Sequence, residues 1–480
     1  MSSSGSNPVD EIWEDRPSRP NNELKKLPLA IAGKSWEIKF SELRDKMKSV
    51  NTPFVLLSAL DDIAWILNIR GSDIHCNPCF FSYFLISQEN AYLYTQKPQS
   101  DPVFEDFKDN LTILNYSDAI TDIPAKIGKS KVWTTVTLNH AISSQLENKL
   151  ETSVSHICMT KCCKNENEKT AMLSANLKAA RAISKYLAWL QNGNWKNLDE
   201  VSASDELERL YSEEKDFVSL SFDTISSTGN NGAILHYKAK KETCKKIQEN
   251  TTYLVDSGCQ YLDGTTDTTR TVWIGDKVSD YIKECYTRVL KGHIQISNCK
   301  FPEGARGYQI DALARKALWD AGLDFLHGTG HGIGQYGNVH EDPRSMGISY
   351  KFVSMTAPND DDKMVGHDSM TWLRPNYVVS NEPGYYQEGD DGFGIRLENA
   401  IIVENKPISK KYTHFKRDFY GFSDLIFCPY EMRLIDVELL DEDEKTWLNN
   451  YNQKCRDNLL PILDGDDLTK RWVEKNTVKV

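Results

Sequence analysis

The sequence lacks several features that would place it in a specialised class of protein. No apolar run among its 480 residues approaches the roughly 18 residues of a membrane-spanning helix, so we expect no membrane partner. The first residues, MSSSGSNPVDEIWEDRP, contain no apolar signal core, which argues against secretion and predicts a cytoplasmic protein. Lys and Arg number 57 against 69 Asp and Glu, and the net charge of -12 predicts no nucleic-acid partner.

The cysteines form no pattern typical of disulfides or of structural zinc. Eleven cysteines in 480 residues is a low and odd number, unlike that of a disulfide-stabilised domain. One CxxC motif spans Cys76 to Cys79, but no second CxxC supplies the other ligands of a zinc site. We therefore interpret the cysteines as reduced thiols.

The chain does have an ordinary apolar fraction, 40%, and enough length for several domains. A polar lead-in of residues 1–25 precedes strands alternating with helices over residues 26–165, which predict a small α/β domain. Residues 166–428 read as two similar halves, each with helices followed by a strand hairpin, which predicts an α+β domain with a shared sheet. Residues 429–480 form an acidic extension that we expect to pack against the body.

Local patterns predict individual elements as well. Apolar spacing over residues 168–190 indicates a long amphipathic helix. A second helix is predicted to begin near Ser204, because acidic residues follow it and the first turn of a helix favours acids. In the first domain, Arg70 and Asp73 share a turn; they could face a neighbouring site, but we interpret them as a buried salt bridge.

One predicted hairpin carries a pair of aspartates. Residues 253–256 and 268–274 read as strands joined by turn residues. Asp256 ends the first strand and Asp267 opens the second, so the hairpin can bring the two carboxylates side by side. Each alone could be a solvated turn residue, but two like charges this close are costly unless a cation lies between them.

A second hairpin repeats the pattern with glutamates. Glu382 follows a strand that Pro383 and Gly384 end, and Glu398 lies in the returning strand among apolar neighbours. A glutamate in such surroundings points into a protected site and needs a partner.

Between the two hairpins lies a cluster of histidines in a glycine-rich stretch. His327 and His331 belong to the motif HGTGHG, and His340 follows nine residues later. Glycines allow the backbone to approach a ligand closely and leave room for imidazoles. A lone histidine is usually structural, but a cluster in such a loop is typical of a site.

Four carboxylates and one imidazole together predict two bound divalent ions, about 3.5–4 Å apart, with a water or hydroxide between them. Oxygen-rich ligation with one nitrogen favours Mn²⁺, with Co²⁺ or Fe²⁺ as alternatives, over Zn²⁺. Such a site lowers the pKa of the water and polarises a carbonyl, which is the chemistry of amide hydrolysis.

The motifs resemble those of a known family. LVDSG, DGTTDTTRT, HGTGHGIG, NVHE, NEPGYY and GIRLEN are similar to the cytosolic aminopeptidase P (Xaa-Pro aminopeptidase) family, and the likeness runs from about Ile12 to Arg456. The resemblance implies a small creatinase-type N-terminal α/β domain, then a pita-bread catalytic domain of the kind found in creatinase, prolidase and methionine aminopeptidase, and a C-terminal extension of the aminopeptidase P type.

Carried over by position, the resemblance also implies roles for individual residues. It implies metal ligation by Asp256, Asp267, His331, Glu382 and Glu398. Glu382 would also act in catalysis by moving the proton from the water to the leaving nitrogen. Catalytic and substrate-binding roles are implied for His236, His327 and His340, and supporting contacts to the substrate site for Tyr386 and Arg396. From the residues alone, His236 reads as structural.

The activity implied is that of a metallo-exopeptidase which cleaves the N-terminal Xaa-Pro bond of short peptides by attack of a hydroxide that bridges the metal ions. A homodimer is implied as well. The alternative is a catalytically weak or inactive peptidase-like protein, with a binding or regulatory role, that retains the metal site. Two departures from the family are a start at about the second of its three usual domains and a longer stretch at residues 351–375, with an acidic loop expected at 359–362.

Overall fold

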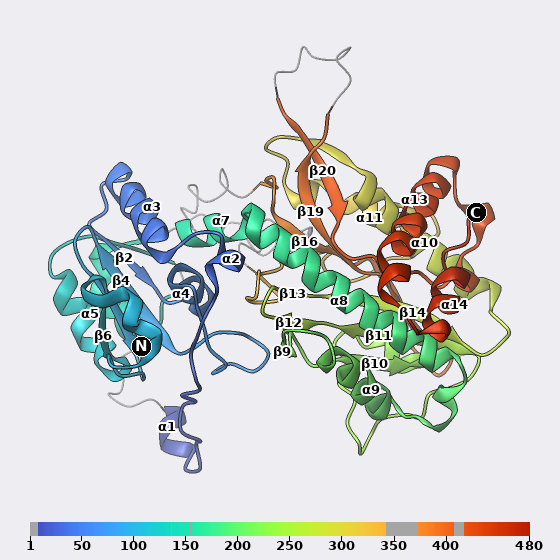
Figure 1. The fold of residues 1–480 in the computed structure, drawn as a ribbon, viewed down its shortest axis with the longest axis horizontal. Helices are drawn as coiled ribbons and strands as arrows, with labels where there is room; N and C mark the ends of the chain where they lie inside the picture. The colour runs from blue at the N-terminus through green and yellow to red at the C-terminus, as the bar shows by residue number, and fades with distance from the viewer. Residues whose placement is uncertain (1–7, 136, 153–154, 342–371, 408–416) are drawn as a thin grey trace.

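The computed structural model describes residues 8–135, 137–152, 155–341, 372–407 and 417–480. The acidic loop expected at residues 359–362, and most of the longer stretch around it, lie outside the described residues. Figure 1 shows a smaller N-terminal lobe beside a larger C-terminal lobe. Four short elements lie outside the main sheets: α1 (Pro8–Ile12), β1 (Lys25–Lys26), α2 (Leu29–Ala32) and β3 (Ile69–Arg70), of which β1 and β3 pair with each other.

The N-terminal lobe is a mixed sheet with helices on both faces. Its strands are β2 (Phe54–Leu57), β4 (Ser82–Ser87), β5 (Ala91–Thr95), β6 (Thr112–Asn115), β7 (Val132–Thr134) and β8 (Leu150–Thr152). Its helices are α3 (Trp36–Ser49), α4 (Leu60–Leu67), α5 (Ala119–Ile127), α6 (His140–Leu146) and α7 (His156–Cys162). The strand order is β6-β5-β4-β2-β7-β8. Successive side chains of β4 enter opposite cores: Phe84 packs with residues of α3 and α4, and Leu85 with residues of α5 and α6.

Two helices lead into the C-terminal lobe. α8 (Glu166–Gln191) runs from the seam between the lobes across the larger one (Figure 1). α9 (Glu200–Ser212) begins four residues before Ser204, so the predicted start was wrong. The reason is a capping box: Asp199 accepts a hydrogen bond from the Ser202 backbone N–H at 2.7 Å.

The first half of the C-terminal lobe contains the predicted aspartate hairpin. Its strands are β9 (Phe217–Leu220), β10 (Ile225–Thr228), β11 (Thr251–Ser257), β12 (Cys259–Tyr261), β13 (Gly264–Thr265) and β14 (Thr268–Ile274), followed by α10 (Asp280–Asn298), β15 (Lys300–Pro302) and α11 (Gly307–Trp319). β11 lies between β10 and β14 and is antiparallel to both. The small β12–β13 hairpin extends the turn between β11 and β14.

The second half contains the glutamate hairpin and the C-terminal extension. Its strands are β16 (Val378–Asn381), β17 (Gly384–Gln387), β18 (Phe393–Arg396), β19 (Asn399–Asn405) and β20 (Phe419–Asp424), and its helices are α13 (Glu442–Leu459) and α14 (Asp467–Lys475). Leu448 and Tyr451 of α13 and Trp472 of α14 are buried in the hydrophobic cores of this lobe. The prediction that the extension packs against the body is therefore confirmed.

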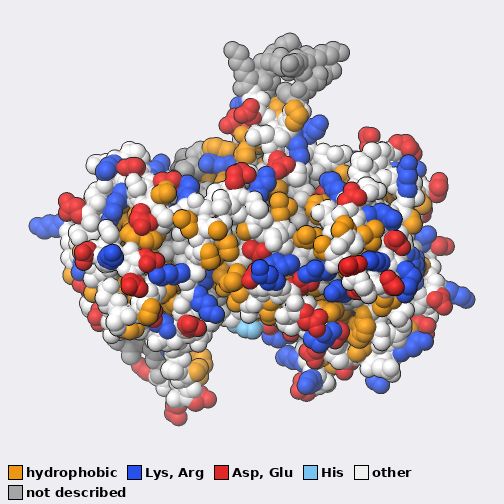
Figure 2. Space-filling view, viewed as in Figure 1, with side chains coloured by type: hydrophobic (Ala, Val, Ile, Leu, Met, Phe, Trp, Pro, Cys, Tyr) orange, Lys and Arg blue, Asp and Glu red, His pale blue; other side chains and the backbone are white. Residues whose placement is uncertain are grey.

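The distribution of surface charge and the character of the helices agree with the mixed charge and ordinary apolar fraction of the sequence. Acidic and basic side chains are interspersed over the face shown in Figure 2. Among the helices that the structure describes, none combines the length and apolar character needed to cross a bilayer.

Candidate active site

Strand register places the two aspartates on one face of the first hairpin. Asp256 of β11 lies opposite Thr269 of β14. Side chains alternate along a strand, so Asp267, two residues before Thr269, projects to the same side as Asp256. Asp256 Oδ2 accepts a hydrogen bond from Arg396 at 2.6 Å. The hairpin therefore does what its sequence predicts and brings both carboxylates into one site.

The second hairpin delivers its glutamates at a break in both strands. Asn381 pairs with Asn399 on one side of the break and Gly384 with Arg396 on the other. This shared register sets Glu382 across from Glu398. The two hairpins are joined at this point, because the Glu398 backbone N–H donates to Thr269 O at 3.1 Å and Thr269 Oγ1 donates to Glu398 Oε2 at 2.8 Å.

The glycine-rich stretch carries His331 against the second hairpin. A Cβ on Gly330 would lie 1.9 Å from Ser380 O, so only glycine permits this approach. Ser380 Oγ accepts from the His331 backbone N–H at 3.0 Å. His331 Nδ1 lies 2.9 Å from Gly332 O, which leaves Nε2 turned towards Asp267, at 3.3 Å, and Glu382, at 3.4 Å.

Electrostatics show that these acids do not tolerate full ionisation on their own. Burial raises the pKa of Asp267 to about 7, with a further rise from the charge of Asp256 against the hydrogen bond from His331. Burial, and then the charges of Asp267 and Glu382, raise the pKa of Glu398 well above its usual value. Burial lowers the pKa of His331, but its bond to Asp267 and the charge of Glu382 outweigh this and raise the pKa to about 9. Added positive charge would therefore stabilise the ionised form of these acids.

The residues fit divalent cations. Ligand atoms of Asp267, His331 and Glu398 all lie within 4.8 Å of one another. Within the described part of the chain, Asp256 Oδ1 and Glu398 Oε1 are buried oxygens without a hydrogen-bond donor, which is costly unless a ligand satisfies them. Oxygen donors with a single imidazole suit Mn²⁺, Fe²⁺ or Co²⁺ better than a structural Zn²⁺.

All five predicted ligands line a cavity of about 450 Å³ together with His236, His327, His340 and Arg396. The rings of His331 and His340 lie 4.1 Å apart, centre to centre. His327 Nε2 lies 2.9 Å from the hydroxyl of Tyr386, which in turn accepts from Arg396 at 2.8 Å. Thus the structure brings every predicted site residue to the cavity wall or into contact with it, including His236.

Sequence reasoning missed two supporting side chains and the apolar part of the wall. Thr269 and Ser380 each stand two residues from a predicted ligand, on the same face of the strand, so period-2 alternation could have identified them. The apolar lining comes from Phe222, Ile225, Leu235 and Val339, for which the sequence carried no signal.

Comparisons with known proteins agree with this geometry. The family model described as "Metallopeptidase family M24" matches residues 170–405. The model "Creatinase/Prolidase N-terminal domain" matches residues 15–168, and "C-terminal region of peptidase M24" matches residues 418–480. The predicted fold, a creatinase-type N-terminal domain followed by a pita-bread domain, is confirmed.

Individual relatives are similar over most of their length. "Probable Xaa-Pro aminopeptidase P" of Arthroderma gypseum is 38% identical, over 98% of this chain and 73% of its own. The protein of the same name from Talaromyces marneffei is 39% identical, over 98% and 71%. The crystal structure of X-prolyl aminopeptidase from Caenorhabditis elegans, described as a cytosolic enzyme with a di-nuclear active site, has a TM-score of 0.89 at 31% identity, over 99% of this chain and 76% of that one. The chain therefore belongs to metallopeptidase family M24, and the resemblance to aminopeptidase P predicted from its motifs is confirmed.

Proposed function

We propose that the protein is a dinuclear metallo-aminopeptidase that removes the N-terminal residue from short peptides whose second residue is proline. The observation that carries this proposal is the group of four carboxylates, three of them buried, and one histidine that face a single cavity, with two buried oxygens lacking a donor. The names of the relatives support the substrate class. We infer Mn²⁺ as the metal and Asp256, Asp267, His331, Glu382 and Glu398 as its ligands.

Two divalent ions bound by these residues would supply a water of lowered pKa and polarise the scissile carbonyl. Glu382 is suited to proton transfer because solvent and substrate can reach it. Its side chain is 17% exposed, compared with 12% for Asp256 and 6% for Asp267. Burial raises the pKa of Glu382, which makes its carboxylate a stronger base, suited to accept a proton from water and pass it to the departing nitrogen.

The bond before proline makes a particular demand on the site. Its nitrogen carries no hydrogen, so the site cannot hold this amide through an N–H donor and has to hold the ring of proline against the wall instead. As in any peptide hydrolysis, a proton must also reach the leaving nitrogen. Leu235 and Val339 offer apolar surface on the cavity wall beside His236 and His340. We infer that these histidines orient the peptide and stabilise charge that develops on its carbonyl oxygen.

A chain of hydrogen bonds links the metal ligands to this substrate side. Arg396 donates to Asp256 at 2.6 Å and to the Tyr386 hydroxyl at 2.8 Å, and that hydroxyl lies 2.9 Å from His327. The guanidinium has the planar geometry needed to serve both partners at once. We infer that Arg396 orients Asp256 for ligation and that Tyr386 fixes the ring of His327.

The decisive experiment measures release of the first residue from fluorogenic Xaa-Pro peptides by Mn²⁺-loaded protein, with Xaa-Ala peptides in parallel. We expect cleavage of the proline series only, a loss of at least a hundredfold in Glu382→Ala, and unchanged activity in Asp391→Asn, an exposed acid in the turn of the same hairpin. Metal-loaded protein that cleaves no peptide would instead favour the binding or regulatory alternative. Equal cleavage of both series would contradict the proline requirement.

The compartment and the assembly remain parts of the proposal. The worm enzyme is described as cytosolic, and we infer the same location for this chain. The homodimer remains a prediction, which the mass of the protein in solution will test.

A further inference from the structure

The stretch from Gly332 to Glu341, here called the bridging loop, lies between the two lobes of the protein. On the side of the C-terminal lobe, the Gly337 backbone N–H donates to Thr265 Oγ1 at 3.0 Å, and Gln260 Nε2 donates to Gly337 O at 2.9 Å. These contacts tie the middle of the loop to the β12–β13 hairpin, two residues from Asp267.

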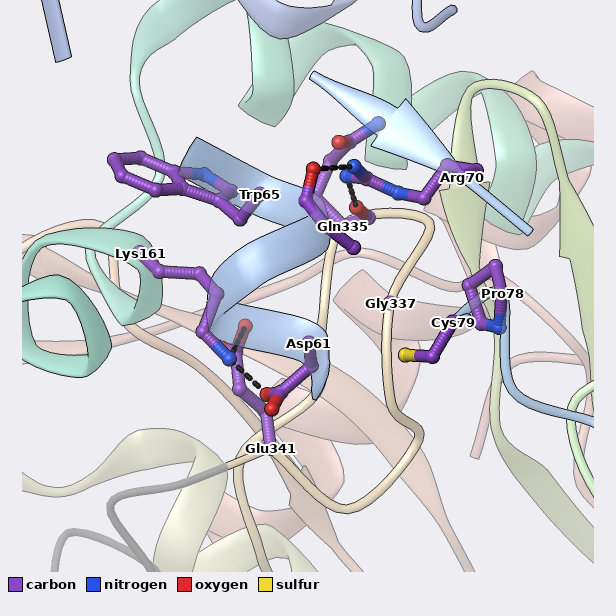
Figure 3. Close-up of a pocket in the computed structure, with 10 residues that line it drawn as sticks. Asp61, Trp65, Arg70, Pro78, Cys79, Lys161, Gln335, Gly337 and Glu341 are labelled. Atoms are coloured by element: carbon purple, nitrogen blue, oxygen red, sulfur yellow. Dashed lines mark hydrogen bonds and ion pairs between the residues drawn. The ribbon is translucent and has the colours of Figure 1, made fainter. Parts of the chain in front are cut away.

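The N-terminal lobe holds the same loop through Arg70 (Figure 3). The expected salt bridge with Asp73 does not form between these two described residues. Instead the Arg70 guanidinium donates to Tyr336 O and, at 3.3 Å, to Gln335 O, while Asp73 accepts from backbone N–H groups. Tyr336 has a φ of 42°, a left-handed conformation that is costly for a non-glycine residue and persists only where its surroundings hold it.

A second contact from the N-terminal lobe is a buried group of charges, here called the seam cluster: Asp61, Asp62, Lys161, Lys164 and Glu341. Glu341, at the end of the bridging loop, pairs with Lys164 and lies 3.8 Å from Lys161 Nζ. Lys161 also pairs with Asp61 and lies 3.4 Å from Asp62, and Figure 3 shows its amine pointing between Asp61 and Glu341. No side chain of the cluster is more than 11% exposed.

The cluster connects directly to the active-site cavity. The Glu341 backbone N–H donates to Gly332 O at 2.8 Å, so the two ends of the loop are fastened together. His331 precedes one end and His340 immediately precedes Glu341 at the other, with their rings in edge-to-face contact. A displacement of the Glu341 side chain therefore moves the backbone that carries His340.

We propose that Arg70 and the seam cluster are positioning residues, through which the N-terminal lobe sets the place of His340 in the cavity. Buried ion clusters add little stability compared with apolar replacements of the same size, and a known use of them is to fix one arrangement of the chain. The seam cluster can fix the arrangement of the two lobes, because Asp61 and Asp62 of one lobe and Glu341 of the other all lie close to the amine of Lys161. The catalytic part of this inference rests on the proposed function, whereas the anchoring of the loop does not.

The test compares Lys161→Met and Glu341→Gln with the wild type. Lys161→Arg serves as the conservative rescue. Lys291→Met is the matched control, because Lys291 also pairs with a buried glutamate, Glu444, in the C-terminal lobe. Each metal-loaded protein is measured for amide hydrogen exchange, for metal content, and for kcat and KM on an Xaa-Pro peptide.

We expect exchange in residues 332–341 to become at least tenfold faster in both test variants, with exchange in β11 and α10 unchanged. We expect kcat/KM to fall about tenfold, mainly through KM, while two metal ions are retained. Lys161→Arg should stay within about threefold of the wild type, and Lys291→Met should match it. If Lys161→Met does not fold, Lys161→Met combined with Asp61→Asn keeps the net charge of the cluster.

Unchanged exchange in the loop, or an equal increase throughout the chain, would overturn the inference. Faster loop exchange with unaltered kcat and KM would overturn the role assigned to His340. If the wild type itself cleaves no peptide, the proposed function fails, and the exchange measurement still decides whether the N-terminal lobe holds the loop.

Discussion

Replacing Asp267 with asparagine should change the stability of the protein in opposite directions with and without metal. Without metal, Asp267 is a buried acid among other acids, and its pKa is raised to about 7. A rise from 3.8 to about 7 corresponds to roughly 4 kcal/mol at pH 8, at about 1.4 kcal/mol per pH unit. Burial is the main cause of this rise, and the negative charges of Asp256 and Glu382 add to it.

The hydrogen bond from His331 lowers this pKa and is therefore already included in that figure. The metal-free variant should be more stable than the metal-free wild type by about 4 kcal/mol at pH 8. A folded-state pKa above the unfolded value destabilises the protein only at pH values where the group ionises, so this advantage should shrink below pH 7 and vanish near pH 4.

With metal the order should reverse. Two ions, each at 100 times its dissociation constant, stabilise the wild type by about 5.4 kcal/mol, at about 2.7 kcal/mol per site, and the variant loses this because it lacks a ligand. For a domain of this size, each kcal/mol shifts the melting temperature by about 2–4 °C. Thermal unfolding with chelator and with Mn²⁺, with metal content measured on both proteins and Asp391→Asn as control, checks this. A metal-free variant that melts below the wild type would refute the cost of the buried charge, and equal stabilisation of both proteins by Mn²⁺ would refute ligation by Asp267.

Three further predictions concern other parts of the site. Burial lowers the pKa of His293 to about 3, so its contribution to stability is present above pH 6.5 and is lost as the pH falls. When the pH is lowered from 7.5 to 5, the free energy of unfolding of His293→Gln should therefore fall by about 2 kcal/mol less than that of the wild type, as measured by denaturant titration. Gly330→Ala places a Cβ 1.9 Å from a backbone oxygen and should cost about 3 kcal/mol or more, whereas Gly337→Ala, whose Cβ would meet nothing closer than 3.6 Å, should stay within about 0.5 kcal/mol in the same titration. Arg396→Lys keeps the charge beside Asp256 but not the second bond to Tyr386, so metal affinity should fall about 10–100-fold by calorimetry; an affinity equal to the wild type would contradict the orienting role.

The parts of the site that could be predicted from the sequence are those set by local spacing. A strand that alternates with period 2 and ends in turn residues fixes where Asp256 and Asp267 project once the hairpin forms, and the same holds for Glu382 and Glu398. The sequence predicted that glycines around His331 let the backbone approach a ligand closely, but the contact that requires glycine at Gly330 is with Ser380 O, in β16, and no local pattern marks it.

Errors arose where two local signals competed. The acidic residues after Ser204 suggested a first helical turn there, but the helix begins at Glu200 because Asp199 and Ser202 form a capping box. Acidic residues lie both at the true start, near Asp199, and after Ser204, so acidity alone does not distinguish the two positions. The helix begins where the capping hydrogen bonds form. Reading the spacing of Asp199 and Ser202 as a capping signal would have given the correct start.

Contacts between the lobes lay beyond any local pattern. Proximity in sequence favours Asp73 as the partner of Arg70, yet the guanidinium donates to the carbonyl oxygen of Tyr336, 266 residues away. Every residue carries such an oxygen, so nothing in the sequence marks the one that Arg70 will meet. Lys161 and Glu341 are likewise ordinary surface residue types until the docked lobes bury them. The positions of the four carboxylate ligands thus follow from spacing within each hairpin, whereas the position of His340 depends on how the two lobes meet.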